Sequence, residues 1–172
     1  MILIIDVCAE RLHSYEFVRP IKAIVGVEGV VKHYKELCES DINKAQKVII
    51  CGTGLADDGY LEDIKEFSWL RDFQKPVLGI CAGMQIIGLV FGGKKMRGTE
   101  IGYTSEYIDI LGVNGVQEVY KMHNNYVDFF GTGFFICSDG AIPQAVSRGR
   151  IYGVLFHPEV RQCEIISNFL AL

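Results

Sequence analysis

The stretch PVLGICAGMQIIG, residues 76–88, places a single cysteine between two glycines inside an apolar run. PVLGI is typical of a short buried strand, and a proline is acceptable at the first position of a strand. If GMQIIGLVF then opens a helix, Cys81 lies at the sharp turn between strand and helix, where flanking glycines let neighbouring backbone pass close by. Such a turn aims the thiol at the carboxyl edge of the sheet, where open α/β sheets place their sites.

Further segments repeat this strand and helix alternation. MILIID (residues 1–6) and KVIIC (47–51) indicate buried strands, and helical segments are expected over roughly 11–25 and 58–73. After residue 100, short strands separated by turn residues predict an antiparallel extension and a return strand into the main sheet, with CEIISNFLAL as a closing helix. We therefore expect an α/β fold with a doubly wound, mainly parallel sheet, flanking helices and a small antiparallel extension, built as one domain over 1–172.

The composition limits the classes of function. The chain has 172 residues, of which 49% are hydrophobic and 22% charged, as in an ordinary globular fold. The net charge of −4 comes without a basic cluster, so no nucleic-acid partner is expected. The start MILII has no basic flank, and no uncharged apolar run approaches the ~20 residues of a membrane helix. Six scattered cysteines without a CxxC pair argue against zinc and against a disulfide scaffold. We expect a soluble, cytoplasmic protein with reduced cysteines and no metal or cofactor.

Cys81 has two interpretations. At a helix N-terminus the thiolate is favoured over the thiol, and the free backbone amides after the cysteine can meet a developing oxyanion. A free cysteine is nevertheless usually a small buried hydrophobe, and the short motif alone leaves both interpretations open. A nucleophilic cysteine also needs a base within hydrogen-bond reach and a third group that orients this base.

The best candidate for the base is His157. It follows the strand-like RIYGVLF, so it would also lie at the carboxyl end of a strand, and Glu159 stands two residues later across the rigid Pro158. A carboxylate there could hold the imidazole Nδ1–H while Nε2 faces the thiol. Taken alone, FHPE also fits a capped turn that leads into a helix. His13 and His33 lie in segments with no other chemistry and are interpreted as surface or structural residues.

Together, GICAGMQ and GVLFHPEV resemble the signature of class I, triad-type glutamine amidotransferase domains. The resemblance extends over nearly the whole chain and implies a flavodoxin-like fold, with Cys81 as nucleophile, His157 as base and acid, and Glu159 as orienter. In that family the cysteine attacks the side-chain amide of glutamine, ammonia leaves, and a γ-glutamyl thioester is hydrolysed to glutamate. Gln85 matches the family glutamine that helps to bind the substrate.

The resemblance also implies an oxyanion site formed by two backbone amides. One is the amide of Ala82, directly after the nucleophile, and the other comes from the glycine-rich loop CGTGLADDG, with Gly52, Thr53 and Gly54. Thr53 occupies the donor position and departs from the family's Gly-Gly-Pro or Pro-Gly-Gly types. Because threonine adopts positive φ less readily than glycine, we expect the oxyanion hole to need a partner protein to form. A glycine turn that serves only the sheet is the alternative.

Within the family, FGGKKMRGTEIGYTSEYIDI and KMHNNYVDFF are similar to segments of the glutaminase subunit of GMP synthase. His123 matches a histidine near the face used for the synthase partner, whereas Asn124 and Asn125 stand where that group has an acidic residue. The chain holds no P-loop and no room for a synthase domain, so the resemblance implies a separate ammonia-accepting synthase subunit. Imidazole-glycerol-phosphate, anthranilate and carbamoyl-phosphate synthases remain alternatives for this partner.

Two other functions stay open at this point. The departures at Thr53 and after His123 would suit a catalytically inactive module that binds a partner or glutamine without turnover. A stand-alone γ-glutamyl hydrolase would keep the nucleophile and change the substrate; Gln85 favours the amidotransferase.

Overall fold

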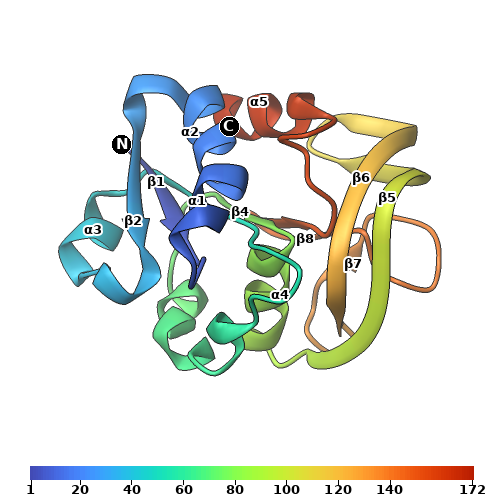
Figure 1. The fold of residues 1–172 in the computed structure, drawn as a ribbon, viewed down its shortest axis with the longest axis horizontal. Helices are drawn as coiled ribbons and strands as arrows, with labels where there is room; N and C mark the ends of the chain where they lie inside the picture. The colour runs from blue at the N-terminus through green and yellow to red at the C-terminus, as the bar shows by residue number, and fades with distance from the viewer.

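A computed structural model describes all residues, 1–172. Its centre is a seven-stranded sheet in the order β2-β1-β3-β4-β9-β8-β7 (Figure 1). The first five strands are parallel, and β8 pairs antiparallel with both β9 and β7. In this order the strands are β2 (Gly29–His33), β1 (Ile2–Asp6), β3 (Lys47–Ile50), β4 (Val77–Ile80), β9 (Ile151–Val154), β8 (Ala145–Arg148) and β7 (Phe135–Ile136). The predicted mainly parallel sheet and the return strand β9 are confirmed.

The alternation of side chains in β1 explains why both faces of the sheet are covered. Leu3 and Ile5 belong to one apolar core, whereas Ile2 and Ile4 belong to the other, because successive residues of a strand point to opposite faces. All five residues of the strand are buried, as expected for a strand with helices on both sides.

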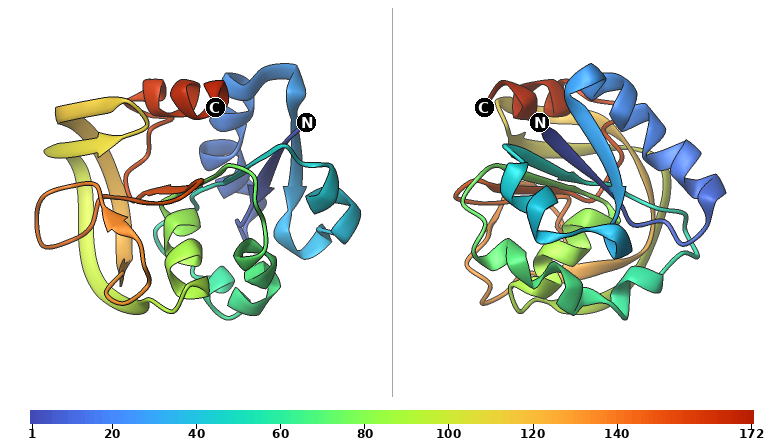
Figure 2. Two further views of the ribbon diagram at one scale, coloured as in Figure 1. Left: turned by 180° about the vertical axis from the view of Figure 1, so that it is seen from behind. Right: turned by 90° about the vertical axis from the view of Figure 1, so that its left-hand side faces the viewer.

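Two groups of helices form the outer layers (Figure 2). α2 and α5 contribute to the core that contains Ile4, and α4 and η4 contribute to the core that contains Ile5. α1 leads into α2. The helices are α1 (Arg11–Phe17), α2 (Arg19–Val25), η1 (Gly26–Glu28), η2 (Tyr34–Glu36), α3 (Glu39–Lys44), η3 (Gly59–Leu61), η4 (Ile64–Arg71), α4 (Ala82–Val90) and α5 (Cys163–Ala171). None of them combines the length and the apolar character that crossing a bilayer requires.

The expected helical segments differ from the observed ones in detail. The segment over 11–25 is divided at Val18, since Pro20 lies in the first turn of α2 and the residues before a proline leave the helix readily. The segment over 58–73 forms the 3₁₀ helices η3 and η4. Its apolar residues recur at three-residue steps, which suits three residues per turn.

The region after residue 93 is longer and more regular than the short strands expected there. β5 (Lys94–Ile110) and β6 (Val113–Asp128) form a separate antiparallel hairpin. Leu111 and Gly112 connect them with positive φ at both residues, as a tight two-residue hairpin turn requires. Figures 1 and 2 show this hairpin at the opposite end of the molecule from β2.

Candidate active site

Cys81 lies in a strained turn between β4 and α4. Its φ of 49° and ψ of −103° are unusual for a residue other than glycine, and such strain is tolerated chiefly at functional positions. The glycines on either side permit a close approach of backbone. A Cβ on Gly83 would lie 2.2 Å from the Ile50 carbonyl oxygen, and one on Gly79 would lie 2.6 Å from the backbone of Gly83. The sequence therefore folds into the elbow that the motif predicts.

His157 and Glu159 form a buried pair beside this elbow. Nδ1 of His157 lies 2.8 Å from Oε1 of Glu159, and the two side chains are 0% and 1% exposed. The backbone amide of His157 donates a hydrogen bond to the Tyr120 carbonyl at 2.8 Å, which fixes the backbone at this residue. A Cβ on Gly52 would lie 2.7 Å from Cε1 of His157 and 3.3 Å from Cβ of Cys81, so both residues meet across this glycine. Nε2 of His157 is buried and has no other partner.

The electrostatics of the pair favour a charged imidazole. Burial alone would lower the pKa of His157, because an imidazolium loses its hydration inside the protein. The electrostatic and hydrogen-bonding interactions with Cys81 and Glu159 outweigh burial and raise the pKa of His157 well above its usual value near 6.5. Because Nδ1 donates its hydrogen bond to Glu159, the proton on Nε2 is the one that His157 can transfer near Cys81.

Gln85 lies one helical turn after Cys81 and is 3% exposed. Its Oε1 accepts a hydrogen bond from the Tyr60 hydroxyl at 2.9 Å, and its amide nitrogen has no acceptor within the protein. Tyr60 was not singled out by the sequence, although it follows the same glycine-rich loop as Thr53. The contact fixes the orientation of the Gln85 amide, so that its N–H groups are available to a bound molecule.

The loop after β3 also differs from expectation. The amides of Gly52, Thr53 and Gly54 make no hydrogen bond within the protein, as a pair of oxyanion donors requires. None of the three residues has a positive φ. Thr53 therefore does not need the positive φ on which the expected need for a partner rested. The flanking glycines are explained by close approach: Gly52 faces His157, and Gly54 faces the ring of His13.

These elements enclose a small pocket. It is lined by the loop after β3, by the elbow with the first turn of α4, and by the segment of β6 from Met122 to Asn125. The Met122 carbonyl lies 3.6 Å from Sγ of Cys81. The cavity volume is about 10 Å³, close to the space of one water molecule. The pocket in this structure therefore has enclosed room for about one water molecule.

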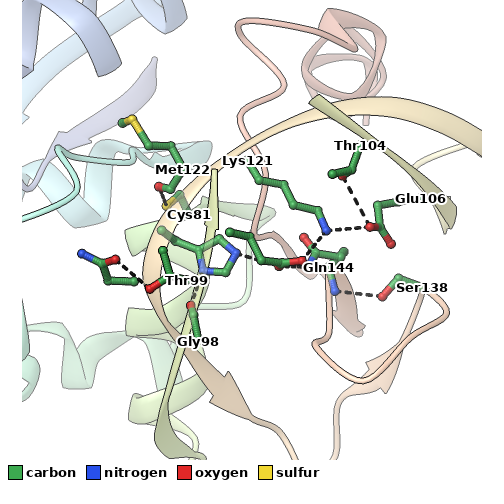
Figure 3. Close-up of polar contacts among 12 residues, drawn as sticks. Cys81, Gly98, Thr99, Thr104, Glu106, Lys121, Met122, Ser138 and Gln144 are labelled. Carbon is green, nitrogen blue, oxygen red and sulfur yellow. Dashed lines mark hydrogen bonds and ion pairs between the residues drawn. The ribbon is translucent and has the colours of Figure 1, made fainter. Parts of the chain in front are cut away.

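A buried polar cluster lies behind the pocket on the inner face of the hairpin (Figure 3). Nζ of Lys121 pairs with Glu100 at 2.7 Å and with Glu106 at 2.6 Å. The other carboxylate oxygen of Glu100 lies 2.9 Å from Nε2 of His123 and accepts from the Gln144 amide at 2.7 Å. Burial lowers the pKa of His123, and the adjacent Glu100 offsets only part of this effect. The cluster anchors the strand that lines the pocket.

This cluster changes the interpretation of His123. The expected partner-face histidine is only 2% exposed, because Glu100 and the Gly98 carbonyl, 3.1 Å from Nδ1, hold its ring inward. It borders the pocket and offers almost no surface to another protein.

Asn124 and Asn125 also have a local explanation. The Asn124 amide donates to the Leu55 carbonyl at 3.0 Å, and the Asn125 amide lies 3.2 Å from both carboxylate oxygens of Asp58. An acidic residue at position 125 would face the Asp58 carboxylate and repel it. The two asparagines thus fasten the hairpin to the loop across the pocket.

Two further residues were missed by the sequence interpretation. His13, expected to be a surface or structural residue, lies against Gly54, and its Nδ1 is 3.1 Å from Oδ2 of Asp57. The sequence indicates only that each residue follows the carboxyl end of a strand, and the structure shows that these two strands, β1 and β3, are neighbours in the sheet.

Comparison with known proteins agrees with this geometry. The family model described as "Glutamine amidotransferase class-I" matches residues 18–171. The chain belongs to this family of enzymes. This amidotransferase is 38% identical over 112 residues to the glutamine-hydrolysing GMP synthase of Clostridium tetani, covering 55% of this chain and 22% of that protein. The GMP synthase of Staphylococcus aureus (strain JH9) is 35% identical over 109 residues, covering 55% and 21%. The matched part thus spans about a fifth of the length of these relatives.

Solved structures share the fold of this amidotransferase. A Thermoplasma acidophilum protein, described as one chain of a candidate GMP synthase, superposes with a TM-score of 0.84 at 22% identity, covering 99% of this chain and 92% of that one. A glutamine amidotransferase of Thermotoga maritima gives a TM-score of 0.70 at 18% identity, covering 99% and 80%. At these identities the likeness establishes the fold alone.

Proposed function

We propose that this amidotransferase hydrolyses the side-chain amide of glutamine to glutamate and ammonia, with Cys81, His157 and Glu159 as its catalytic triad. The observation that carries the proposal is the strained elbow of Cys81 beside the buried His157–Glu159 pair, 2.8 Å apart. A merely structural cysteine has no need of a positive φ or of an orienting imidazole.

The proposed reaction gives each of these groups one role. Sγ of Cys81 attacks the amide carbon, and the oxygen that becomes negative is met by the amides of Ala82 and Thr53. His157 donates the Nε2 proton to the departing nitrogen, which leaves as ammonia. A γ-glutamyl thioester remains on Cys81. His157, now neutral, accepts a proton from water, and the hydroxide attacks the thioester carbon. The C–S bond breaks and glutamate leaves, which restores the Cys81 thiolate beside the protonated His157.

Gln85 is proposed to bind the substrate from the wall of the pocket. Its amide is oriented by Tyr60 and has free N–H groups, which suit an oxygen atom of glutamine.

The ammonia is proposed to pass to a separate synthase subunit, which the similarity to GMP synthases suggests to be a GMP synthase. Imidazole-glycerol-phosphate, anthranilate and carbamoyl-phosphate synthases are the alternatives. Co-purification from the native cell, followed by addition of the captured synthase to a glutaminase assay, distinguishes them by the acceptor that is aminated.

The hydrolysis is tested with Cys81→Ala and with Cys163→Ala as a matched control at an exposed cysteine outside the pocket. Glutamate formation is measured for the protein alone and with its synthase, and Cys81 is probed with a glutamine-mimicking diazoketone. We expect wild type and Cys163→Ala to release glutamate and to be labelled at Cys81. Equal glutamate release by wild type and Cys81→Ala would refute the proposal.

A second candidate is a binding module without turnover, which the departures from the family pattern at Thr53, Asn124 and Asn125 favour. It predicts that glutamine binds, as measured by calorimetry, while Cys81 stays unlabelled even when the synthase is present.

A further inference from the structure

The carboxylate of Asp57 has three hydrogen-bond donors at one oxygen atom. Oδ2 accepts a hydrogen bond from the Thr53 hydroxyl at 2.7 Å and from the Ala9 amide at 2.8 Å, and it lies 3.1 Å from Nδ1 of His13. The side chain of Asp57 is only 3% exposed. Its position therefore depends on all three donors, and theirs depends on it.

These contacts close the loop on itself and attach it to the segment after β1. The Asp57 amide donates to the Gly54 carbonyl at 2.9 Å, so that residues 54–57 form a turn. His13 packs closely against this turn: a Cβ on Gly54 would lie 2.7 Å from two atoms of the imidazole. The ring of His13 thus occupies the space into which the loop would otherwise relax.

Thr53 is the link between this network and the candidate catalytic centre. The Thr53 hydroxyl is held by Asp57, and the Thr53 amide has no acceptor in the protein. Thr53 also lines the same pocket as Cys81 and Ala82. A β-branched side chain with a bonded hydroxyl restricts the backbone to which it is attached. A glycine at position 53 would lack this restraint, because it has no side chain to bond to Asp57.

We propose that His13 and Asp57 are positioning residues, which act through the Thr53 hydroxyl to hold the Thr53 amide towards the carbonyl oxygen of a glutamine bound at Cys81. This inference rests on the proposed glutamine hydrolysis. It also gives a physical role to the threonine that departs from the family's glycine-rich loop. Oxyanion donors lower a barrier only when they are held in place before the charge develops.

Matched pairs of variants test the network. Thr53→Val removes the hydroxyl and keeps the shape, and Thr53→Ser keeps the hydroxyl. His13→Leu removes the donor, and His13→Asn places an amide nitrogen near the position of Nδ1. Each variant is assayed in the form in which the wild type hydrolyses glutamine, alone or with its synthase, for kcat and KM. Alkylation of Cys81 by iodoacetamide is followed separately by mass spectrometry of the peptide that contains it.

We expect kcat to fall about ten-fold or more in Thr53→Val and His13→Leu, with KM changed less than about three-fold and with recovery in the Ser and Asn variants. Cys81 alkylation should keep the wild-type rate in all four, because displacement at iodoacetamide develops no oxyanion. Unchanged kcat, loss without recovery, or a parallel fall in alkylation would each overturn the inference. Failure of the proposed function is distinct, because the wild type itself would then release no more glutamate than Cys81→Ala.

Discussion

Replacing Lys121 by methionine should destabilise the hairpin that forms one wall of the pocket. Lys121 is 2% exposed and pairs with Glu100 and Glu106 at 2.7 and 2.6 Å, while these carboxylates are 26% and 19% exposed. Methionine fills a similar volume and leaves two carboxylates close together without their cation. Removing one partner of a buried ion pair typically costs 3–5 kcal/mol, and partial hydration of the carboxylates places this case near the lower end, at about 3 kcal/mol.

For a chain of this length, such a loss lowers the melting temperature by about 6–12 °C. Calorimetry and urea unfolding of Lys121→Met measure it, with Lys95→Met as the control, since Lys95 lies exposed on the same hairpin. A loss below about 1 kcal/mol would refute the reasoning, because it would mean that the carboxylates regain full hydration at no cost.

The same variant should alter the response to acid. Burial raises the pKa of Glu100, but the hydrogen bond and charge of Lys121 outweigh this and bring the pKa below its usual value of 4.5. A group whose pKa is depressed by folding stabilises the protein above its unfolded pKa, and this contribution disappears as the pH falls through the folded value. The difference in unfolding free energy between wild type and Lys121→Met should therefore shrink below about pH 4.5. A difference that is constant from pH 7 to pH 3 would contradict this assignment.

Three further substitutions probe the site directly. Glu159→Gln should reduce kcat about 10²-fold or more, since the imidazole loses the charge that fixes its tautomer; steady-state glutamate formation measures this. Gly83→Ala should destabilise the fold by about 2 kcal/mol or more in urea unfolding, because its Cβ would lie 2.2 Å from the Ile50 carbonyl oxygen. Asn125→Asp should open the pocket through repulsion with Asp58 and lower the KM for glutamine about three-fold or more, measured in the same assay.

Each of these has an outcome that would contradict it. Full activity of Glu159→Gln would mean that the tautomer is fixed by another group. Wild-type stability of Gly83→Ala would show that the elbow can shift at little cost. An unchanged or higher KM in Asn125→Asp would show that the asparagine contact does not hold the pocket closed.

The strand, elbow and helix around Cys81 could be predicted from the sequence because their determinants are local. An apolar run, two glycines and an apolar helix are contiguous, and the histidine and glutamate that join them follow another strand of the same sheet. The edge strand β2 was not predicted, since its two valines, 36% and 39% exposed, do not belong to a long buried apolar run.

The polar network around the loop could not be derived from the sequence in the same way. His13 and Asp57 are distant in the chain and meet only because β1 and β3 are neighbours in the sheet. The length of the hairpin was also not predicted. Glycines at positions 98, 102 and 115 interrupt the apolar pattern of the sequence, although the strands continue through them.

The tight backbone around Cys81 limits how this protein can acquire a new substrate. Side chains added at Gly52, Gly79 or Gly83 would strike His157 or the backbone beneath the elbow, so the catalytic interior offers almost no freedom for redesign. The rim is different, because the contacts of Asn124 and Asn125 across the pocket are made by their side-chain amides. Libraries that seek activity on other carboxamides should therefore vary the rim and leave the elbow unchanged.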